Sequence, residues 1–220
     1  MLSDVDWLRR NPSAALFGVQ LLGIAAYPAM EGSGIGRAAF NAFGVAVVLL
    51  ALWAVRASPG LTWVGILLAL PAAGLLLVQT VFELPSLVGW SSAFEAALYL
   101  YAAACMLVYM LADHVITRDE LWAVGATFTL VAWAFAHAYV VCQAIQPNSF
   151  TAAVDADDPR TWVELLFLSV TTLTSTGLSD IVPIRPAARA IVMFEQIAGL
   201  GYVVMLVSRV VGLTIKSRAD

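Results

Sequence analysis

Residues 160–183 read RTWVELLFLSVTTLTSTGLSDIVP, and this stretch decides the class of fold that the chain can adopt. Its first part, 160–173, has the apolar composition of a buried helix, and Pro159 before it is a residue type favoured at helix starts. At 1.5 Å per residue that helix would be about 20 Å long, whereas a membrane-crossing helix needs about 20 residues. The polar segment 174–180 and Pro183 then lead the chain away. We therefore expect a half-length helix followed by an extended polar segment.

A half-length helix that enters from one side and a polar segment that leaves toward the same side describe a re-entrant loop. Non-helical backbone survives at membrane depth only where it is buried in protein or lines a water-filled path. The composition is also compatible with two alternatives, an amphipathic hairpin on the periplasmic surface and a plain surface loop. The re-entrant interpretation is the one followed below.

The composition makes the bilayer the expected solvent and partner. Of the 220 residues, 61% are hydrophobic and 12% are charged, and the mean hydropathy is +0.88. Soluble domains carry roughly 25% charged residues, so a soluble fold and a disordered chain are both excluded. Two cysteines cannot form an extensive disulfide framework. Lys and Arg total 11 against 15 acidic residues, so no nucleic-acid partner is expected.

Apolar runs of membrane-crossing length predict six transmembrane helices. Gly, Pro and Ser clusters or a short charged linker separate most of them. The expected spans are 13–30, 37–56, 61–82, 90–112, 120–145 and 187–213. The half-helix 160–173 lies between the fifth and the sixth span. The predicted fold class is therefore an all-α membrane protein with a re-entrant pore helix and loop before its last helix.

The distribution of Lys and Arg predicts that both termini are cytoplasmic. With a cytoplasmic N-terminus, seven basic residues fall on the inner side and four on the outer side. The inner set is Arg9, Arg10, Arg56, Arg118, Arg209, Lys216 and Arg218, and the outer set is Arg37, Arg160, Arg185 and Arg189. An even number of spans agrees with this orientation.

Residues 164–214 resemble the pore module of the tetrameric potassium-channel superfamily, in its bacterial branch. The family's pore helix ends in a pattern such as TLTTVGYGD, and residues 172–180 here read TLTSTGLSD. The exit DIVP at 180–183 and the segments EQIAGLGY at 195–202 and SRVVGL at 208–213 are also similar to the family. The resemblance covers about a quarter of the chain, and the first four helices show no comparable signature.

The resemblance implies a homotetrameric cation channel in a bacterial inner membrane. Residues 1–116 would form a four-helix scaffold or unknown sensor, and 117–220 the pore domain. That domain would comprise an outer helix 120–145, a pore helix 160–173, a filter 174–180 and an inner helix 187–213. In the family, filter carbonyl oxygens from four chains replace the hydration shell of K⁺. By this resemblance the filter would be Thr174, Ser175, Thr176, Gly177, Leu178, Ser179 and Asp180, and K⁺ or Na⁺ would be held at Ser175, Thr176 and Gly177.

The departures from the family pattern predict weak discrimination between K⁺ and Na⁺. Leu178 replaces a tyrosine that braces the family filter, and Ser179 replaces the second glycine. Phe167, Thr171 and Glu195 are the candidate supports behind the filter, and Thr171 is expected to pair its hydroxyl with that of Thr176. No cofactor is expected beyond permeant monovalent cations. The alternative is a non-conducting relative that acts as a membrane scaffold or partner subunit.

Acidic and small residues complete the predicted pore. Asp155, Asp157 and Asp158 from each chain would form an acidic outer mouth that concentrates cations. Gly199 and Gly201 are candidate hinges of the inner helix. Among other acids, Glu164 is expected to stabilise the start of the pore helix, and Glu95 to reach toward the outer interface.

The fourth span and the histidines exclude two other functions. A voltage sensor repeats Arg or Lys every third residue along its fourth helix, and 90–112 contains none. The layout is therefore that of voltage-gated channels without their charged sensor. His114 and His137 are the only histidines, and neither belongs to a metal-binding or hydrolase motif, so no enzymatic activity is expected.

Overall fold

The computed structural model describes residues 11–30, 43–44, 46–51, 53, 61–82, 84–112 and 117–219. Most of the predicted span 37–56 lies outside these residues, as do Arg9, Arg10, Arg37, Arg56 and His114. The described part is largely helical, and residues 43, 44, 46–51 and 53 are helical as well.

In the described part of the chain, six long or medium helices carry the fold. They are α2 (Pro12–Met30), α4 (Thr62–Phe82), α5 (Val88–Leu111), α6 (Arg118–Ile145), α7 (Trp162–Leu173) and α8 (Pro186–Ala219). A 3₁₀ turn, η1 (Pro85–Leu87), precedes α5. The strands β1 (Phe150–Thr151) and β2 (Val182–Pro183) pair antiparallel, with Phe150 opposite Pro183 and Thr151 opposite Val182.

Four helices of the described part are long and apolar enough to cross a membrane. These candidate spans are Thr62–Gln79, Pro85–Leu111, Arg118–Ile145 and Pro186–Val211. They match the third, fourth, fifth and sixth predicted spans. The apolar parts of α2 and α7, Pro12–Ala26 and Trp162–Leu173, are shorter. Of the six predicted spans, the structure thus supports four within the described residues.

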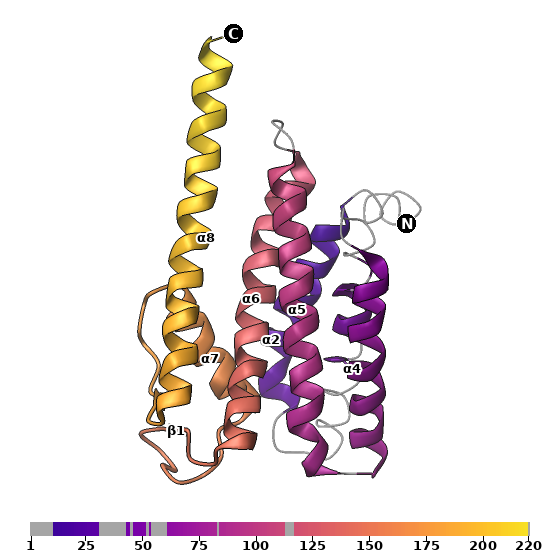
Figure 1. Cartoon of the computed structure of the whole chain (residues 1–220), viewed down its shortest axis with the longest axis vertical. Helices are drawn as coiled ribbons and strands as arrows, with labels where there is room; N and C mark the ends of the chain where they lie inside the picture. Colours follow the sequence, from indigo (N-terminus) through magenta and orange to yellow (C-terminus); the bar gives the residue numbers. More distant parts are fainter. Residues whose placement is uncertain are drawn as a thin grey trace.

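The helices pack around α5 and α6, which lie side by side at the centre of the molecule (Figure 1). On one side α4 packs on α5 and α2 packs on α6, and on the other side α7 and α8 pack on α6 and on each other. Small buried residues let the central helices approach closely, as is common between membrane helices. They include Ala102, Ala103, Ala123, Ala126 and Ala136.

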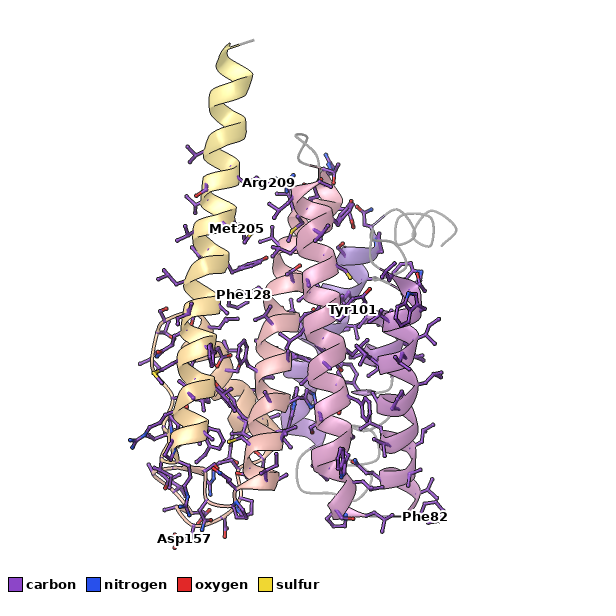
Figure 2. All side chains as sticks on the ribbon, viewed as in Figure 1. Phe82, Tyr101, Phe128, Asp157, Met205 and Arg209 are labelled. Carbon is purple, nitrogen blue, oxygen red and sulfur yellow. The ribbon has the colours of Figure 1, made fainter. Side chains whose placement is uncertain are left out.

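Charged residues gather at the two ends of the helices. Arg209 lies toward the end where α6 begins, whereas Asp157 and Phe82 lie at the opposite end (Figure 2). A buried ion pair joins α6 to α8 near the first end, with Arg209 Nη2 2.9 Å from Glu120 Oε2.

The last two helices meet through a glycine. Gly199 of α8 lies against Leu173, the last residue of α7, so that an added Cβ would lie 3.0 Å from the Cα and the carbonyl carbon of Leu173 and closer still to its oxygen. Nothing lies within 4 Å of the corresponding position at Gly201, although both glycines belong to the same unbroken helix. Gly199 is therefore required by the close approach of two backbones.

The change Gly199→Ala is expected to destabilise the chain, and Gly201→Ala is the matched control. Overpacking against backbone atoms costs about 1–3 kcal/mol, which outweighs the helix propensity that alanine adds. We expect the free energy of unfolding, measured by SDS titration in detergent micelles, to fall for Gly199→Ala and to stay equal or rise for Gly201→Ala. Equal values for the two variants would contradict the packing described here.

Candidate functional site

The start of α7 is set by a pair of reciprocal hydrogen bonds. The Thr161 hydroxyl accepts from the Glu164 N–H at 3.3 Å, and the Glu164 carboxylate accepts from the Thr161 N–H at 2.6 Å. This capping box satisfies two N–H groups that have no partner inside the helix. It places the first helical residue at Trp162, two residues later than predicted, and gives Glu164 the structural role expected of it.

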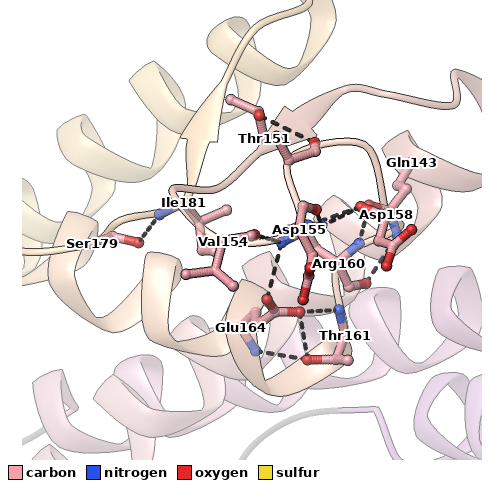
Figure 3. A network of polar contacts seen from close by, with 11 residues as sticks. Gln143, Thr151, Val154, Asp155, Asp158, Arg160, Thr161, Glu164, Ser179 and Ile181 are labelled. Carbon is pink, nitrogen blue, oxygen red and sulfur yellow. Dashed lines mark hydrogen bonds and ion pairs between the residues drawn. The ribbon is translucent and has the colours of Figure 1, made fainter.

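Arg160 organises the acidic loop before α7 (Figure 3). Its side chain is buried, and its guanidinium donates to the carbonyl oxygens of Val154, Asp155 and Asp158. It also lies 3.2 Å from Glu164 Oε1. A guanidinium has five N–H donors in a rigid plane, which suits several acceptors held close together.

The three aspartates of the loop keep their side chains exposed. Asp155, Asp157 and Asp158 all face outward, while the backbone carbonyls of the first and last are held by Arg160. The sequence placed Arg160 only among the outer basic residues and did not predict that it holds the carbonyls of the acidic loop. A single Arg inside an acidic loop, four residues before Glu164, is the signal that could have found it.

The segment after α7 folds back onto the helix end through one carbonyl. The Thr171 oxygen accepts from the Thr176 N–H at 2.9 Å, the Gly177 N–H at 3.1 Å and the Thr176 hydroxyl at 3.2 Å. Ser175 and Gly177 both have positive φ, at 59° and 65°. With these two residues in the left-handed conformation, the chain turns so that the N–H groups of Thr176 and Gly177 both point at the Thr171 oxygen.

Threonine hydroxyls complete this turn, in a pattern that differs from the predicted one. The Thr171 hydroxyl donates to the Leu168 carbonyl at 2.9 Å, so its contact with Thr176 runs through the carbonyl oxygen instead. A helical threonine hydroxyl reaches a carbonyl of its own preceding turn easily, which explains the difference. The Thr174 and Thr176 hydroxyls lie 3.0 Å apart, and Thr174 also donates to the Val170 carbonyl at 2.7 Å.

Residues 174–178 are exposed in the single chain, and the segment then becomes anchored again. Leu178 is 78% exposed. The Ser179 hydroxyl accepts from the Ile181 N–H at 3.0 Å, and Ile181 is buried beside the strand pair β1–β2. In Figure 1 the chain accordingly rises through α7 and returns along 174–185 to the start of α8. We call residues 162–180 the hairpin below.

A hollow of about 330 Å³ lies where the hairpin faces α8. Its walls combine oxygen-bearing residues of the hairpin with one polar and two apolar residues of α8. They are Thr171, Thr172, Ser175, Gly177, Gln196, Ile197 and Leu200. Three of the predicted pore and support residues, Thr171, Ser175 and Gly177, therefore share one surface with the inner helix.

Glu195 lies behind α7 in a buried cluster that joins three helices. Its carboxyl group accepts from the Tyr139 hydroxyl of α6 and contacts the Ser169 hydroxyl of α7. The Ser169 oxygen is also 2.7 Å from the Ala132 carbonyl oxygen. Glu195 thus supports the middle of α7 and does not contact 174–180 directly. Phe167, another predicted support, is 46% exposed.

The proton count of this cluster constrains Glu195. The single Ser169 hydroxyl proton can serve either the Ala132 carbonyl or Glu195, but not both. A protonated Glu195 that donates to Ser169 and accepts from Tyr139 satisfies all of these atoms. The sequence reasoning missed Tyr139 and Ser169, although two polar residues inside apolar helices were the available signal.

A second buried acid, Glu95 of α5, corrects a prediction. It does not reach the outer interface, because it is 3% exposed and its Oε2 lies 3.5 Å from His137 Nδ1 of α6. Glu95 is the eighth of the 24 residues of α5, and its carboxyl group meets a polar partner on the neighbouring helix α6. His137 also accepts from the Trp162 indole N–H at 3.1 Å.

One known protein family matches the region that contains the hairpin. Residues 126–216 match the model of a family described as ion channel. The chain carries an ion-channel domain. The matched region starts inside α6 and ends inside α8, so it includes Glu195, the hairpin and Gly199. No curated protein and no solved structure matches the chain.

The matched domain and the apolar helices together support an integral membrane protein. The match points away from an enzyme. It covers less than half of the chain, and the helices before residue 126 lie outside it.

The Glu195 cluster leads to a prediction about stability. Glu195→Gln preserves both a donor for Ser169 and an acceptor for Tyr139, whereas Glu195→Ala leaves the buried Tyr139 hydroxyl without its acceptor and the Ser169 oxygen without its donor. Unsatisfied buried polar groups cost about 1–3 kcal/mol each. Thermal unfolding in detergent is expected to show Glu195→Gln near the parent chain and Glu195→Ala lower by several degrees.

Asp157→Ala, in the exposed loop, is the control and should leave the midpoint unchanged. Equal destabilisation by Glu195→Gln and Glu195→Ala would show that the cluster requires an ionised carboxylate.

Proposed function

We propose that the chain forms a homotetramer in which four hairpins surround one axis and conduct monovalent cations. The exposed polar segment 174–178 supports this most strongly. Lipid cannot hydrogen-bond backbone or hydroxyl groups, so a non-helical segment at membrane depth needs protein or water around it. Four copies around an aqueous axis supply both, and one hairpin per chain is a quarter of such a ring.

The proposed membrane topology has six spans, with the hairpin as a re-entrant loop between α6 and α8. Both termini would be cytoplasmic, in the inner membrane of a bacterium. The Glu120–Arg209 pair would lie toward the cytoplasm and the acidic loop toward the outside. This orientation agrees with the excess of basic residues on cytoplasmic sides.

The proposed filter is Thr174–Asp180 by sequence, with K⁺ or Na⁺ at Ser175, Thr176 and Gly177. The Thr171 carbonyl holds the inner half of this segment at two N–H groups and a hydroxyl. Its outer half has less support, because the exposed Leu178 has no hydroxyl and Ser179 hydrogen-bonds locally. A loosely held outer half favours weak discrimination between K⁺ and Na⁺.

The remaining parts of the proposal follow from charge and packing. Asp155, Asp157 and Asp158 of four chains would attract cations to the outer mouth. Voltage sensing by arginines is not part of the mechanism, since 90–112 has no basic residue. The channel would need no cofactor besides its permeant ions, and its partners would be lipid and its own copies.

A second candidate function is that of a non-conducting relative, which acts as a membrane scaffold or partner subunit. The observation in its favour is Leu178, which stands where the family has its bracing tyrosine and is exposed. Conduction measurements separate the two candidates.

Recording from the purified chain in planar bilayers tests the proposal. We expect cation currents with K⁺ preferred over Na⁺ by less than about a hundredfold in bi-ionic reversal potentials. Gly177→Ala should reduce the unitary conductance by about tenfold, because alanine disfavours the left-handed conformation of this position. Asp180→Asn should change it as well, through the lost charge.

Gly74→Ala is the matched control, since nothing lies within 4 Å of the added Cβ and α4 is remote from the hairpin. Its currents should equal those of the parent chain. Currents that are unchanged in both Gly177→Ala and Asp180→Asn would place the ion path elsewhere, and silent bilayers with folded protein would favour the scaffold.

A further inference from the structure

Glu95 and His137 form a buried polar contact between the N-terminal helices and the channel domain. The matched channel region begins at residue 126, so His137 of α6 lies inside it and Glu95 of α5 lies outside it. Figure 1 shows α6 between α5 and the hairpin, in agreement with the packing of α5 on α6 and of α6 on α7. Any influence of α5 on the start of α7 at this level therefore passes through side chains of α6.

The Trp162 indole decides where His137 carries its proton. Trp162 is the first residue of α7, and its indole nitrogen lies 3.1 Å from His137 Nε2. An indole N–H can only donate, so Nε2 is the nitrogen without a proton. The imidazole is then neutral and carries its proton on Nδ1, which lies 3.5 Å from Glu95 Oε2. His137 thus accepts from α7 and presents an N–H to α5.

The same reasoning assigns the protons of Glu95. Its neighbour His137 is neutral in this arrangement, and Arg160, which lines the same cavity, is already paired with Glu164. An ionised Glu95 would be a buried charge without a counterion, so the group is the neutral acid. Oε2 faces an N–H and is therefore the carbonyl oxygen, which leaves the acid proton on Oε1.

Packing alone does not fix the orientation of the imidazole. The centroid of the His137 ring lies 5.6 Å from that of Tyr99 and 5.4 Å from that of Trp162. These apolar contacts hold the ring between two neighbours but do not distinguish its nitrogens. A cavity of about 250 Å³ borders Glu95, His137 and Trp162, so the ring has room to turn. Its orientation therefore depends on the two polar partners, one on each side.

We propose that Glu95 is a positioning residue for α7. Its carbonyl oxygen holds the His137 imidazole in the orientation in which Nε2 accepts from the Trp162 N–H. The N-terminal helices thereby fix the first helical residue of the hairpin, although α5 lies outside the matched channel region. This role concerns the position of α7 and holds whether or not the hairpin conducts ions.

The first test reads the proton of His137 directly. The chain has two histidines, so His114→Gln leaves His137 as the only one. We expect magic-angle-spinning NMR of this full chain, with ¹³C- and ¹⁵N-labelled histidine in lipid bilayers at neutral pH, to show one protonated ring nitrogen. That nitrogen should be bonded to Cγ, which identifies it as Nδ1, and the nitrogen bonded to Cδ2 should be unprotonated. A proton on Nε2, alone or together with Nδ1, would overturn the proposal.

Substitutions at Glu95 distinguish a positioning role from simple packing. Glu95→Gln keeps a carbonyl oxygen for Nδ1 and should leave the His137 spectrum unchanged, because no charge is involved. Glu95→Leu has a similar volume but no acceptor, so most of the signal should move to the form with the proton on Nε2. A parent-like spectrum in Glu95→Leu, or the same change in Glu95→Gln, would contradict the role given to Glu95.

Hydrogen exchange of the full chain in detergent measures the consequence for α7. Amides in its first turns should exchange about fivefold or more faster in Glu95→Leu, the factor expected for one lost hydrogen bond. Trp162→Phe keeps an aromatic ring without the N–H and should have the same effect, which keeps the test decisive if Glu95→Leu does not fold. Glu95→Gln and Gly74→Ala, whose added Cβ contacts nothing within 4 Å, are the controls and should exchange as the parent does. Parent-like exchange in Trp162→Phe would refute the proposal.

Discussion

The carbonyl oxygen of Thr171 accepts hydrogen bonds from two N–H groups and one hydroxyl of the segment that follows it, and the rest of the channel domain depends on this interaction. Backbone groups inside a membrane must be satisfied without bulk water. The Thr171 carbonyl accepts from the N–H groups of Thr176 and Gly177, and these bonds end α7 and turn the chain back toward the side from which it came. The remaining oxygens of 174–180 are then free to face an axis or a neighbouring copy.

The supports of the hairpin come from helices far away in the sequence. Gly199 lets α8 reach the end of α7, Glu195 joins α8 to Ser169 and Tyr139, and the His137–Trp162 bond ties the start of α7 to α6. At the other end of the helices Arg209 pairs with Glu120. The hairpin is thus held at its start, middle and end, while its polar segment stays exposed.

The sequence predicted the features that depend on local chemistry. The short α7 and the position of α8 follow from helix length and proline, each within a few residues. The burial of Glu95 and the partners of Glu195 could not be predicted, because they join residues more than 25 positions apart whose helix faces are decided only by packing. The predicted hydroxyl pair of Thr171 and Thr176 was wrong for a different reason: the Thr171 hydroxyl has a local acceptor, the Leu168 carbonyl, which competes with Thr176.

The central claim is that four hairpins converge around one aqueous axis at membrane depth. A cryo-electron microscopy map of the full chain in lipid nanodiscs tests it most directly. The account predicts four-fold symmetric particles in which residues 174–180 line the axis within the lipid layer. A map with fewer chains, or with 174–180 at the headgroups and away from any axis, would contradict it.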